Sequence, residues 1–183
     1  METQSGIRVL QMQVQDGQVT GVTVNMGQAK LAPERIPVSL PGSEIIGMPV
    51  SIDGKEWEIT CVSMGNPHCV VFCEDPDSLD LTKVGPKFEK APIFPEGVNT
   101  EFIRVIDRKT LQMRVWERGS GETLACGTGA CASAVAAILR GYCDRKEEIT
   151  VRLKGGELKI RWDLEAVWMT GPAETVFTGE VEA

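Results

Sequence analysis

The chain has 183 residues, of which 42% are hydrophobic and 25% charged; this suits one globular domain, or one domain and part of a second. The formal net charge of −7 and the lack of a Lys/Arg cluster argue against nucleic acid as a partner, because phosphate binding needs clustered basic side chains. No apolar run approaches the ~20 residues that span a membrane, and the polar start, Met1–Gly6, is unlike a signal peptide. We therefore expect a cytoplasmic protein.

The six cysteines contain no CxxC pair, and His68 is the only histidine. In a cytoplasmic chain such cysteines are not a disulfide framework. A metal site is not expected either, because His68, Cys69 and Cys73 on one alternating strand cannot all converge on an ion. Apart from Cys126, the cysteines are predicted to be small core residues, namely Cys61, Cys69, Cys73, Cys131 and Cys143.

The first half of the chain reads as short strands separated by turns. Asp-Gly pairs at residues 16–17 and 53–54 are typical of β-hairpin turns, and alternating segments flank each pair. An apolar run bounded by turn residues predicts a buried strand. In chain order these predicted strands are residues 7–14, 18–24, 49–52, 57–62 and 68–73.

The second half adds two predicted helices and three further hairpins. Residues 79–89 form one helix, which Asp80 would cap. The Ala-rich segment 129–139, followed by Gly141, is the stronger helix. The hairpins turn around residues 107–109, at residues 155–156 and near Asp163. The pattern predicts an α+β fold, with largely antiparallel strands wrapped around a central helix.

Cys126 lies where chemistry is most strongly indicated, in a Gly-rich turn directly before the Ala-rich helix. The first N–H groups of a helix have no internal acceptor and carry partial positive charge. A carboxylate can therefore bind at Gly127 and Thr128, and the same field favours the thiolate of Cys126. A substrate held there would have its α-carbon beside a general acid or base. The alternative is that Cys126 is a buried structural residue.

Two loops and a strand end offer polar groups of the kind that recognise an amino acid. Asn66 precedes a proline between two predicted strands, and Asn99 ends a loop before another. An amide can both donate and accept, as ammonium and carboxylate groups require. Arg118 provides a planar fork for a carboxylate, and Glu117 an acceptor for an ammonium. Ordinary turns and a solvent-facing charge pair remain the alternatives.

Three segments occur in the order and approximate spacing of the diaminopimelate epimerase family, and the chain resembles that family from about Ser5 to its end. They are Met64–His68, Phe94–Asn99 and Glu117–Ala130. The last is highly specific to the family. The resemblance implies a cofactor-independent isomerase of lysine biosynthesis that interconverts LL- and meso-diaminopimelate by cysteine acid/base chemistry.

The resemblance also implies a role for each residue that matches the family pattern. Cys126 would be the acid/base of the C-terminal domain, and the N–H groups of Gly127 and Thr128 would bind the carboxylate at the reacting centre. Recognition of the distal amino-acid end would fall to the remaining four residues: Asn66, Asn99, Glu117 and Arg118. The fold would have two similar domains with the substrate between them, and a complete version would be a homodimer.

On this reading residues 27–170 form the C-terminal domain, and residues 1–26 and 171–183 belong to the N-terminal domain. The family's second cysteine lies in a Cys-Gly-Asn-Gly-type motif, which is absent from these 183 residues. Inversion needs an acid and a base on opposite faces of the carbon, so we expect this chain alone not to epimerise; a separately encoded N-terminal half would complete it. The alternatives are a phenazine-synthesis-type isomerase, a proline racemase-like protein, or a non-catalytic ligand-binding remnant.

Overall fold

The computed structural model describes residues 2–3, 6–7, 9–163, 165–175 and 177–180. Arg8, in the predicted strand 7–14, lies outside the described residues, as do residues 1, 4–5, 176 and 181–183 of the predicted terminal segments. The strands are β1 (Glu2–Thr3), β2 (Gly6–Ile7), β3 (Leu10–Gln15), β4 (Gln18–Asn25), β5 (Met48–Ile52), β6 (Lys55–Ser63), β7 (Pro67–Phe72), β8 (Asn99–Asp107), β9 (Thr110–Glu117), β10 (Gly121–Thr123), β11 (Glu148–Leu153), β12 (Gly156–Trp162) and β13 (Val167–Gly171). The α-helices are α1 (Leu81–Glu89) and α2 (Gly127–Leu139), and two 3-10 turns cover Pro33–Arg35 and Pro76–Ser78.

The strands from β3 onward form one mixed sheet in the order β3-β4-β13-β12-β11-β9-β8-β7-β6-β5, with β10 paired to β9. Two of its pairings are parallel, β7 with β8 and β9 with β11, and the others are antiparallel. β1 and β2 pair separately. The predicted α+β class with largely antiparallel strands is confirmed.

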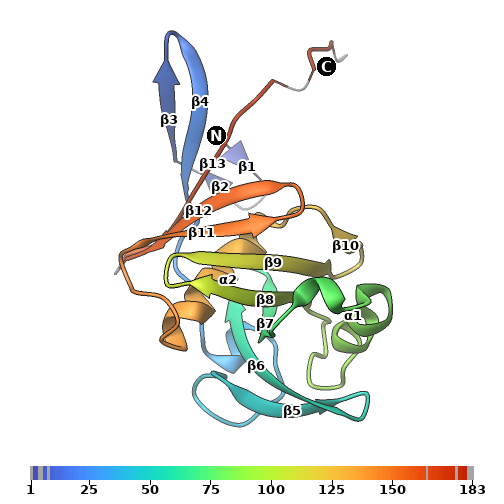
Figure 1. Ribbon diagram of the computed structural model, residues 1–183. Helices are drawn as coiled ribbons and strands as arrows, with labels where there is room; N and C mark the ends of the chain where they lie inside the picture. The colour runs from blue at the N-terminus through green and yellow to red at the C-terminus, as the bar shows by residue number, and fades with distance from the viewer. Residues whose placement is uncertain (1, 4–5, 8, 164, 176, 181–183) are drawn as a thin grey trace.

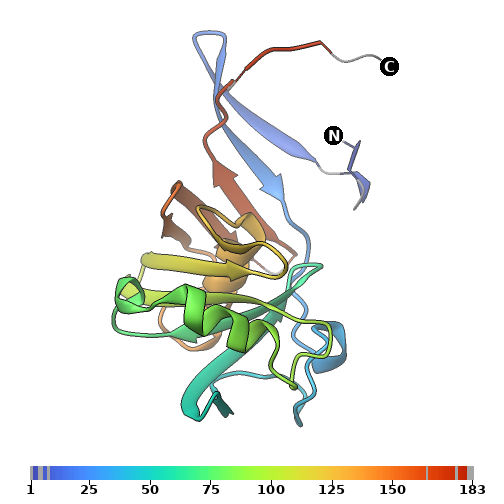
Figure 2. The same ribbon diagram turned by 90° about the vertical axis from the view of Figure 1, so that its right-hand side faces the viewer.

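Helix α2 lies at the centre of the fold, and the sheet curves around it (Figures 1 and 2). It contacts strands β6 to β9 and β11 to β13. Every residue from Gly129 to Ala137 is buried, because alanines and other small residues let the surrounding strands approach closely. The predicted arrangement of strands around a central helix is therefore confirmed.

A second core lies on the other face of strands β5 to β9, under helix α1. Alternation along β8 sends Phe102 to this core and Ile103 to the core around α2. Phe88 of α1 packs edge-on against Phe102 at 5.5 Å and against Trp57 at 5.2 Å between ring centroids. Strands β6 to β8 are thus covered on both faces, which makes this part of the sheet a rigid support for the loops at its edge.

Some local predictions need correction. Asp80 precedes α1, but its side chain makes no capping bond to the helix backbone and instead accepts a hydrogen bond from Thr82 Oγ1 at 2.6 Å. Residues 121–123, predicted as part of a turn, form strand β10 because they fold back onto β9. Cys73 is only half-buried, whereas the other predicted core cysteines are buried.

The β3–β4 hairpin projects from the body of the sheet in both views (Figures 1 and 2). It turns at Asp16 and Gly17, whose φ angles of 51° and 78° match the turn that an Asp-Gly pair favours. One face of the hairpin is apolar and open: Met12 is 66% exposed and Val14 60%. β4 pairs with β13, so residues 18–25 of the predicted terminal segment 1–26 continue the ladder, whereas only Gly171 of the segment 171–183 takes part in it. Neither described helix is long and apolar enough to span a membrane.

Candidate active site

Cys126 is the N-cap residue of α2, with the extended backbone that this position requires (φ −138°, ψ 106°). Its sulfur accepts a hydrogen bond from the Gly129 N–H at 3.4 Å and lies 3.6 Å from Thr128 Oγ1. The thiol therefore sits at the positive end of the central helix, beside the free N–H groups of the first turn. The predicted placement of Cys126 before the helix is confirmed.

Burial raises the pKa of the Cys126 thiol to about 12. The carboxylate of Glu101 adds to the rise, and that of Glu117 adds less, while hydrogen bonds from Thr128 and the Gly129 N–H oppose it. The lowering of the pKa that the helix N-terminus alone predicts is therefore outweighed in this chain. Desolvation and the nearby negative charge outweigh the helix field.

Asn66 reaches the same place from the turn between β6 and β7. Its Nδ2 donates to Thr128 Oγ1 at 3.3 Å, and its Oδ1 contacts His68 Nε2 at 3.0 Å. The amide is half-buried. The structure thus brings together Asn66 and Thr128, which lie 62 residues apart, beside Cys126.

Asn99 begins β8, next to β7 in the parallel pairing that sets His68 opposite it. Its Nδ2 donates to the carbonyl of Pro67 at 2.9 Å, and its Oδ1 accepts from the Arg118 N–H at 2.9 Å. Asn99 is 5% exposed. Much of its hydrogen-bonding capacity therefore ties two loops together, and one amide N–H is left for a ligand.

Glu117 and Arg118 follow at the end of β9. The carboxylate of Glu117 accepts a hydrogen bond from Thr123 Oγ1. Arg118 is exposed, and its Nη1 donates to the Glu96 carbonyl at 2.8 Å. Its stem packs over Gly97, where a Cβ would lie 3.1 Å from Arg118 Cδ. The loop 94–99 therefore supports the guanidinium and leaves the rest of its donor fork available.

The six candidate binding residues and Cys126 thus lie along one edge of the sheet, around the N-terminus of α2. Comparison with known proteins shows which protein family has this arrangement. The model of the family described as diaminopimelate epimerase matches residues 60–176. The chain belongs to the diaminopimelate epimerase family.

Relatives within the family are similar along the whole chain. A diaminopimelate epimerase of Acetivibrio thermocellus is 54% identical over 184 residues, which cover 100% of this chain and 65% of the relative. One of Desulfitobacterium hafniense is 52% identical over 180 residues, covering 98% of this chain and 63% of the relative. The chain therefore spans slightly less than two thirds of the length of these diaminopimelate epimerases.

Among solved structures, a probable proline racemase from Agrobacterium radiobacter K84 superposes with a TM-score of 0.70. It is 14% identical in sequence, and the match covers 99% of this chain and 59% of that chain. At this identity the likeness concerns the fold alone. This diaminopimelate epimerase family member thus shares its fold with that probable proline racemase.

Three residues without a predicted role in the site support it. Glu89, at the end of α1, accepts from Trp116 Nε1 at 2.7 Å and from the Gly119 N–H at 3.0 Å, and so holds the turn after Glu117. His68 and Glu101 are fully buried and joined at 2.7 Å. Glu101 directly precedes the apolar pair Phe102 and Ile103, and a charge beside such a core segment is a signal that could have found it.

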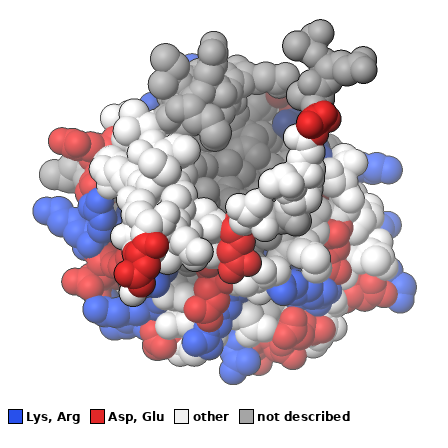
Figure 3. All heavy atoms as spheres, turned by 90° about the horizontal axis from the view of Figure 1, so that it is seen from above, with Lys and Arg blue, Asp and Glu red and all other residues white. Residues whose placement is uncertain are grey.

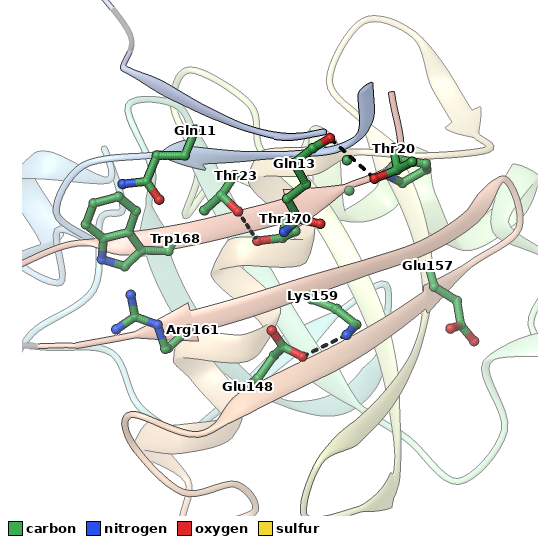
Figure 4. Close-up of a pocket in the computed structure, with 13 residues that line it drawn as sticks. Gln11, Gln13, Thr20, Thr23, Glu148, Glu157, Lys159, Arg161, Trp168 and Thr170 are labelled. Atoms are coloured by element: carbon green, nitrogen blue, oxygen red, sulfur yellow. Dashed lines mark hydrogen bonds and ion pairs between the residues drawn. The ribbon is translucent and has the colours of Figure 1, made fainter. Parts of the chain in front are cut away.

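A hollow of about 500 Å³ lies elsewhere, over β3, β4 and β11 to β13 (Figure 4). Two pairs of its side chains bond to each other, Glu148 with Lys159 in a 3.0 Å ion pair and Thr23 with Thr170 at 2.8 Å. Over the described part of the face in Figure 3, acidic and basic side chains are interspersed. The described residues also contain no group of three His, Cys, Asp or Glu side chains placed to hold a metal ion.

Proposed function

We propose that this chain is the C-terminal portion of a diaminopimelate epimerase, which interconverts LL- and meso-diaminopimelate in the cytoplasm for lysine biosynthesis and requires no cofactor. The observation that carries the proposal is the position of Cys126 as N-cap of the central helix, within hydrogen-bonding distance of Thr128 and next to Asn66. The 54% identity to a diaminopimelate epimerase along the whole chain supports the same reaction.

The helix N-terminus explains why such a site suits α-proton chemistry. A substrate carboxylate would accept hydrogen bonds from the N–H groups of Gly127 and Thr128, which have no acceptor within the helix. Gly127 has no side chain, so a ligand can approach its backbone closely. This places the α-carbon beside the sulfur of Cys126, and the positive end of the helix stabilises the negative charge that develops when the α-proton leaves.

The raised pKa of Cys126 favours its neutral form, which suits the role of a general acid. With a pKa of about 12, the group is a neutral thiol at neutral pH and donates its proton to the carbanion as general acid. In the reverse direction its thiolate removes the α-proton, since the same group serves both directions of a reversible proton transfer. A substrate ammonium close by would favour that thiolate.

The distal end of the substrate would be recognised at the other end of the same edge. The free part of the Arg118 fork suits a carboxylate, and the carboxylate of Glu117 suits an ammonium. Asn66 and Asn99 would contribute their remaining amide hydrogens. A site with both kinds of group selects a substrate with two amino-acid heads, which is why we favour diaminopimelate over a simple amino acid.

A second acid/base group is needed on the opposite face of the α-carbon. We propose that it is a cysteine in the third of the family's length that these 183 residues do not span, whether joined to this chain or separately encoded. Residues 27–170 would then be the C-terminal domain, and residues 1–26 and 171–183 would complete the other. The open apolar face of the β3–β4 hairpin, with Met12 and Val14, would pack against that domain. The complete protein would be a homodimer.

Two other functions are less well supported. A proline racemase-like or phenazine-synthesis-type activity would use the same fold, but the likeness to a probable proline racemase rests on 14% identity. A non-catalytic ligand-binding remnant would keep half of the cleft. A racemase-like or phenazine-synthesis-type enzyme would differ from the proposal in its substrate. A ligand-binding remnant would bind diaminopimelate without turnover even when the missing domain is supplied.

The test joins the N-terminal third of the Acetivibrio thermocellus enzyme to this chain and assays the fusion with LL-diaminopimelate, L-proline and L-lysine. We expect the fusion to form meso-diaminopimelate, to leave proline and lysine unchanged, and the 183-residue chain alone to be inactive. Racemisation of proline would support the racemase-like alternative. Binding of diaminopimelate without turnover by a folded fusion would support the remnant.

A further inference from the structure

We propose that Glu101 is a positioning residue, which holds His68 as an imidazolium so that the ring fixes the orientation of the Asn66 amide beside Cys126. The part played by Asn66 in substrate binding rests on the proposed function. The arrangement of protons between Glu101, His68 and Asn66 does not depend on the proposed function, and it can be measured without enzyme turnover.

Glu101 occupies a position that the surrounding sequence is shaped to admit. It lies in β8 on the face toward α2, and its side chain is fully buried. A Cβ on Gly129, in the first turn of α2, would lie 2.6 Å from Glu101 Oε1, closer than any real contact allows. The second glycine after Cys126 therefore makes room for a carboxylate directly under the helix N-terminus.

The hydrogen bonds of His68 specify where its protons are. Nδ1 lies 2.7 Å from Glu101 Oε1, and Nε2 lies 3.0 Å from Asn66 Oδ1. A carboxylate is an acceptor, and with Asn66 Oδ1 turned toward the ring the second partner is an acceptor too, so in this arrangement both ring nitrogens donate. A neutral imidazole has one N–H only. The two contacts together thus describe an imidazolium paired with a carboxylate.

The energetics of burial support the same assignment. An isolated carboxylate in a protein interior costs several kcal/mol, and a paired cation offsets much of that cost. Glu101 Oε2 has no hydrogen-bond partner among the described residues, so His68 is the group that compensates the charge. A buried ion pair with an unsatisfied oxygen contributes little to stability, which favours a role in the geometry of the site.

The pair is connected to Cys126 through Asn66. Because Asn66 Oδ1 is held by the His68 ring, its Nδ2 must face the other way, where it donates to Thr128 Oγ1 at 3.3 Å. Thr128 Oγ1 lies 3.6 Å from the sulfur of Cys126. The buried carboxylate therefore sets which end of the Asn66 amide, and hence an N–H donor, is presented at the site.

The test uses the fact that His68 is the only histidine in the chain. Nitrogen-15 NMR of the imidazole, recorded on this chain at neutral pH, shows directly which ring nitrogens carry a proton. We expect both to be protonated in the wild type. In Glu101→Gln, whose amide cannot balance an imidazolium, one of the two N–H signals should be lost and the side-chain NH₂ signals of Asn66 should shift. Glu148→Gln, a surface carboxylate paired with Lys159, is the matched control and should change neither.

A bare ring nitrogen in the wild type would overturn the assignment, and so would an unchanged His68 pattern in folded Glu101→Gln. The wild-type spectrum alone decides the proton count if that variant fails to fold. Failure of the proposed function would appear instead as an inactive fusion with both ring nitrogens protonated, so the two failures are distinguishable.

Discussion

Replacing Gly129 by alanine tests whether Glu101 is held rigidly beneath the helix N-terminus. The added Cβ would lie 2.6 Å from Glu101 Oε1 and 3.1 Å from Cys126 Sγ. Glu101 is fully buried and bound to His68 at 2.7 Å, so neither it nor the helix can yield without breaking that contact. Gly127→Ala is the matched control in the same turn, because its Cβ would meet only the flexible thioether of Met169 at 3.1 Å.

The magnitude follows from two opposing effects. Alanine in place of glycine stabilises a helix by up to about 1 kcal/mol, and both variants gain this. Forcing extra volume into a packed core costs about 1–3 kcal/mol, and only Gly129→Ala bears this fully. We therefore expect Gly129→Ala to lower the free energy of unfolding by about 1–2 kcal/mol, and Gly127→Ala to leave it unchanged or slightly raised.

Urea unfolding followed by tryptophan fluorescence measures both variants against the wild type. We expect a lower urea midpoint for Gly129→Ala at an unchanged slope, because the variant loses packing in the native state only. If Gly129→Ala were as stable as Gly127→Ala or more so, Glu101 would not be fixed against α2, and its positioning role would lose its structural basis.

Three further predictions concern individual side chains. Burial raises the pKa of Cys126 to about 12. The rate of its alkylation by iodoacetamide, followed by peptide mass spectrometry, should therefore be low at neutral pH and rise about tenfold per pH unit into the alkaline range. A rate that levels off near neutral pH would contradict this. Hydrogen bonds from the backbone N–H groups of Ala166 and Glu165 hold the pKa of Asp163 at about 2, below its usual value. The stability that the Asp163 carboxylate contributes should therefore be present above about pH 4 and disappear toward pH 2. Urea titrations at several pH values measure this, and a wild-type chain no more acid-sensitive than Asp163→Ala would refute it. Gly85→Ala would place a Cβ 2.2 Å from the Trp116 ring, and we expect a loss of about 2 kcal/mol or more in the free energy of unfolding; a neutral effect would mean that α1 can shift.

Local chemistry made much of the fold predictable. The Asp-Gly pairs predicted two hairpins because positive φ angles are needed there, and Asp16 and Gly17 adopt them. The run of small apolar residues after Cys126 predicted the central helix. These features depend on residues close together in the chain, where propensity and turn geometry decide the structure.

The contacts within the site depend instead on strand register, which the sequence does not reveal. The parallel pairing of β7 and β8 sets His68 opposite Asn99, and only then is the Asn99 amide committed to Pro67 and Arg118. The pKa of Cys126 likewise depends on how deeply the surrounding strands bury the sulfur. The helix field could be predicted from sequence, but the opposing desolvation and the charge of Glu101 could not.

The central claim is that Cys126 transfers the proton at the α-carbon. It is tested most directly by proton NMR in deuterated water with LL-diaminopimelate as substrate. The fusion described above is compared with its Cys126→Ala variant. We expect the intact fusion to form meso-diaminopimelate with deuterium at the inverted carbon, and the folded Cys126→Ala variant to form none. Inversion by Cys126→Ala at the rate of the intact fusion would contradict the central claim.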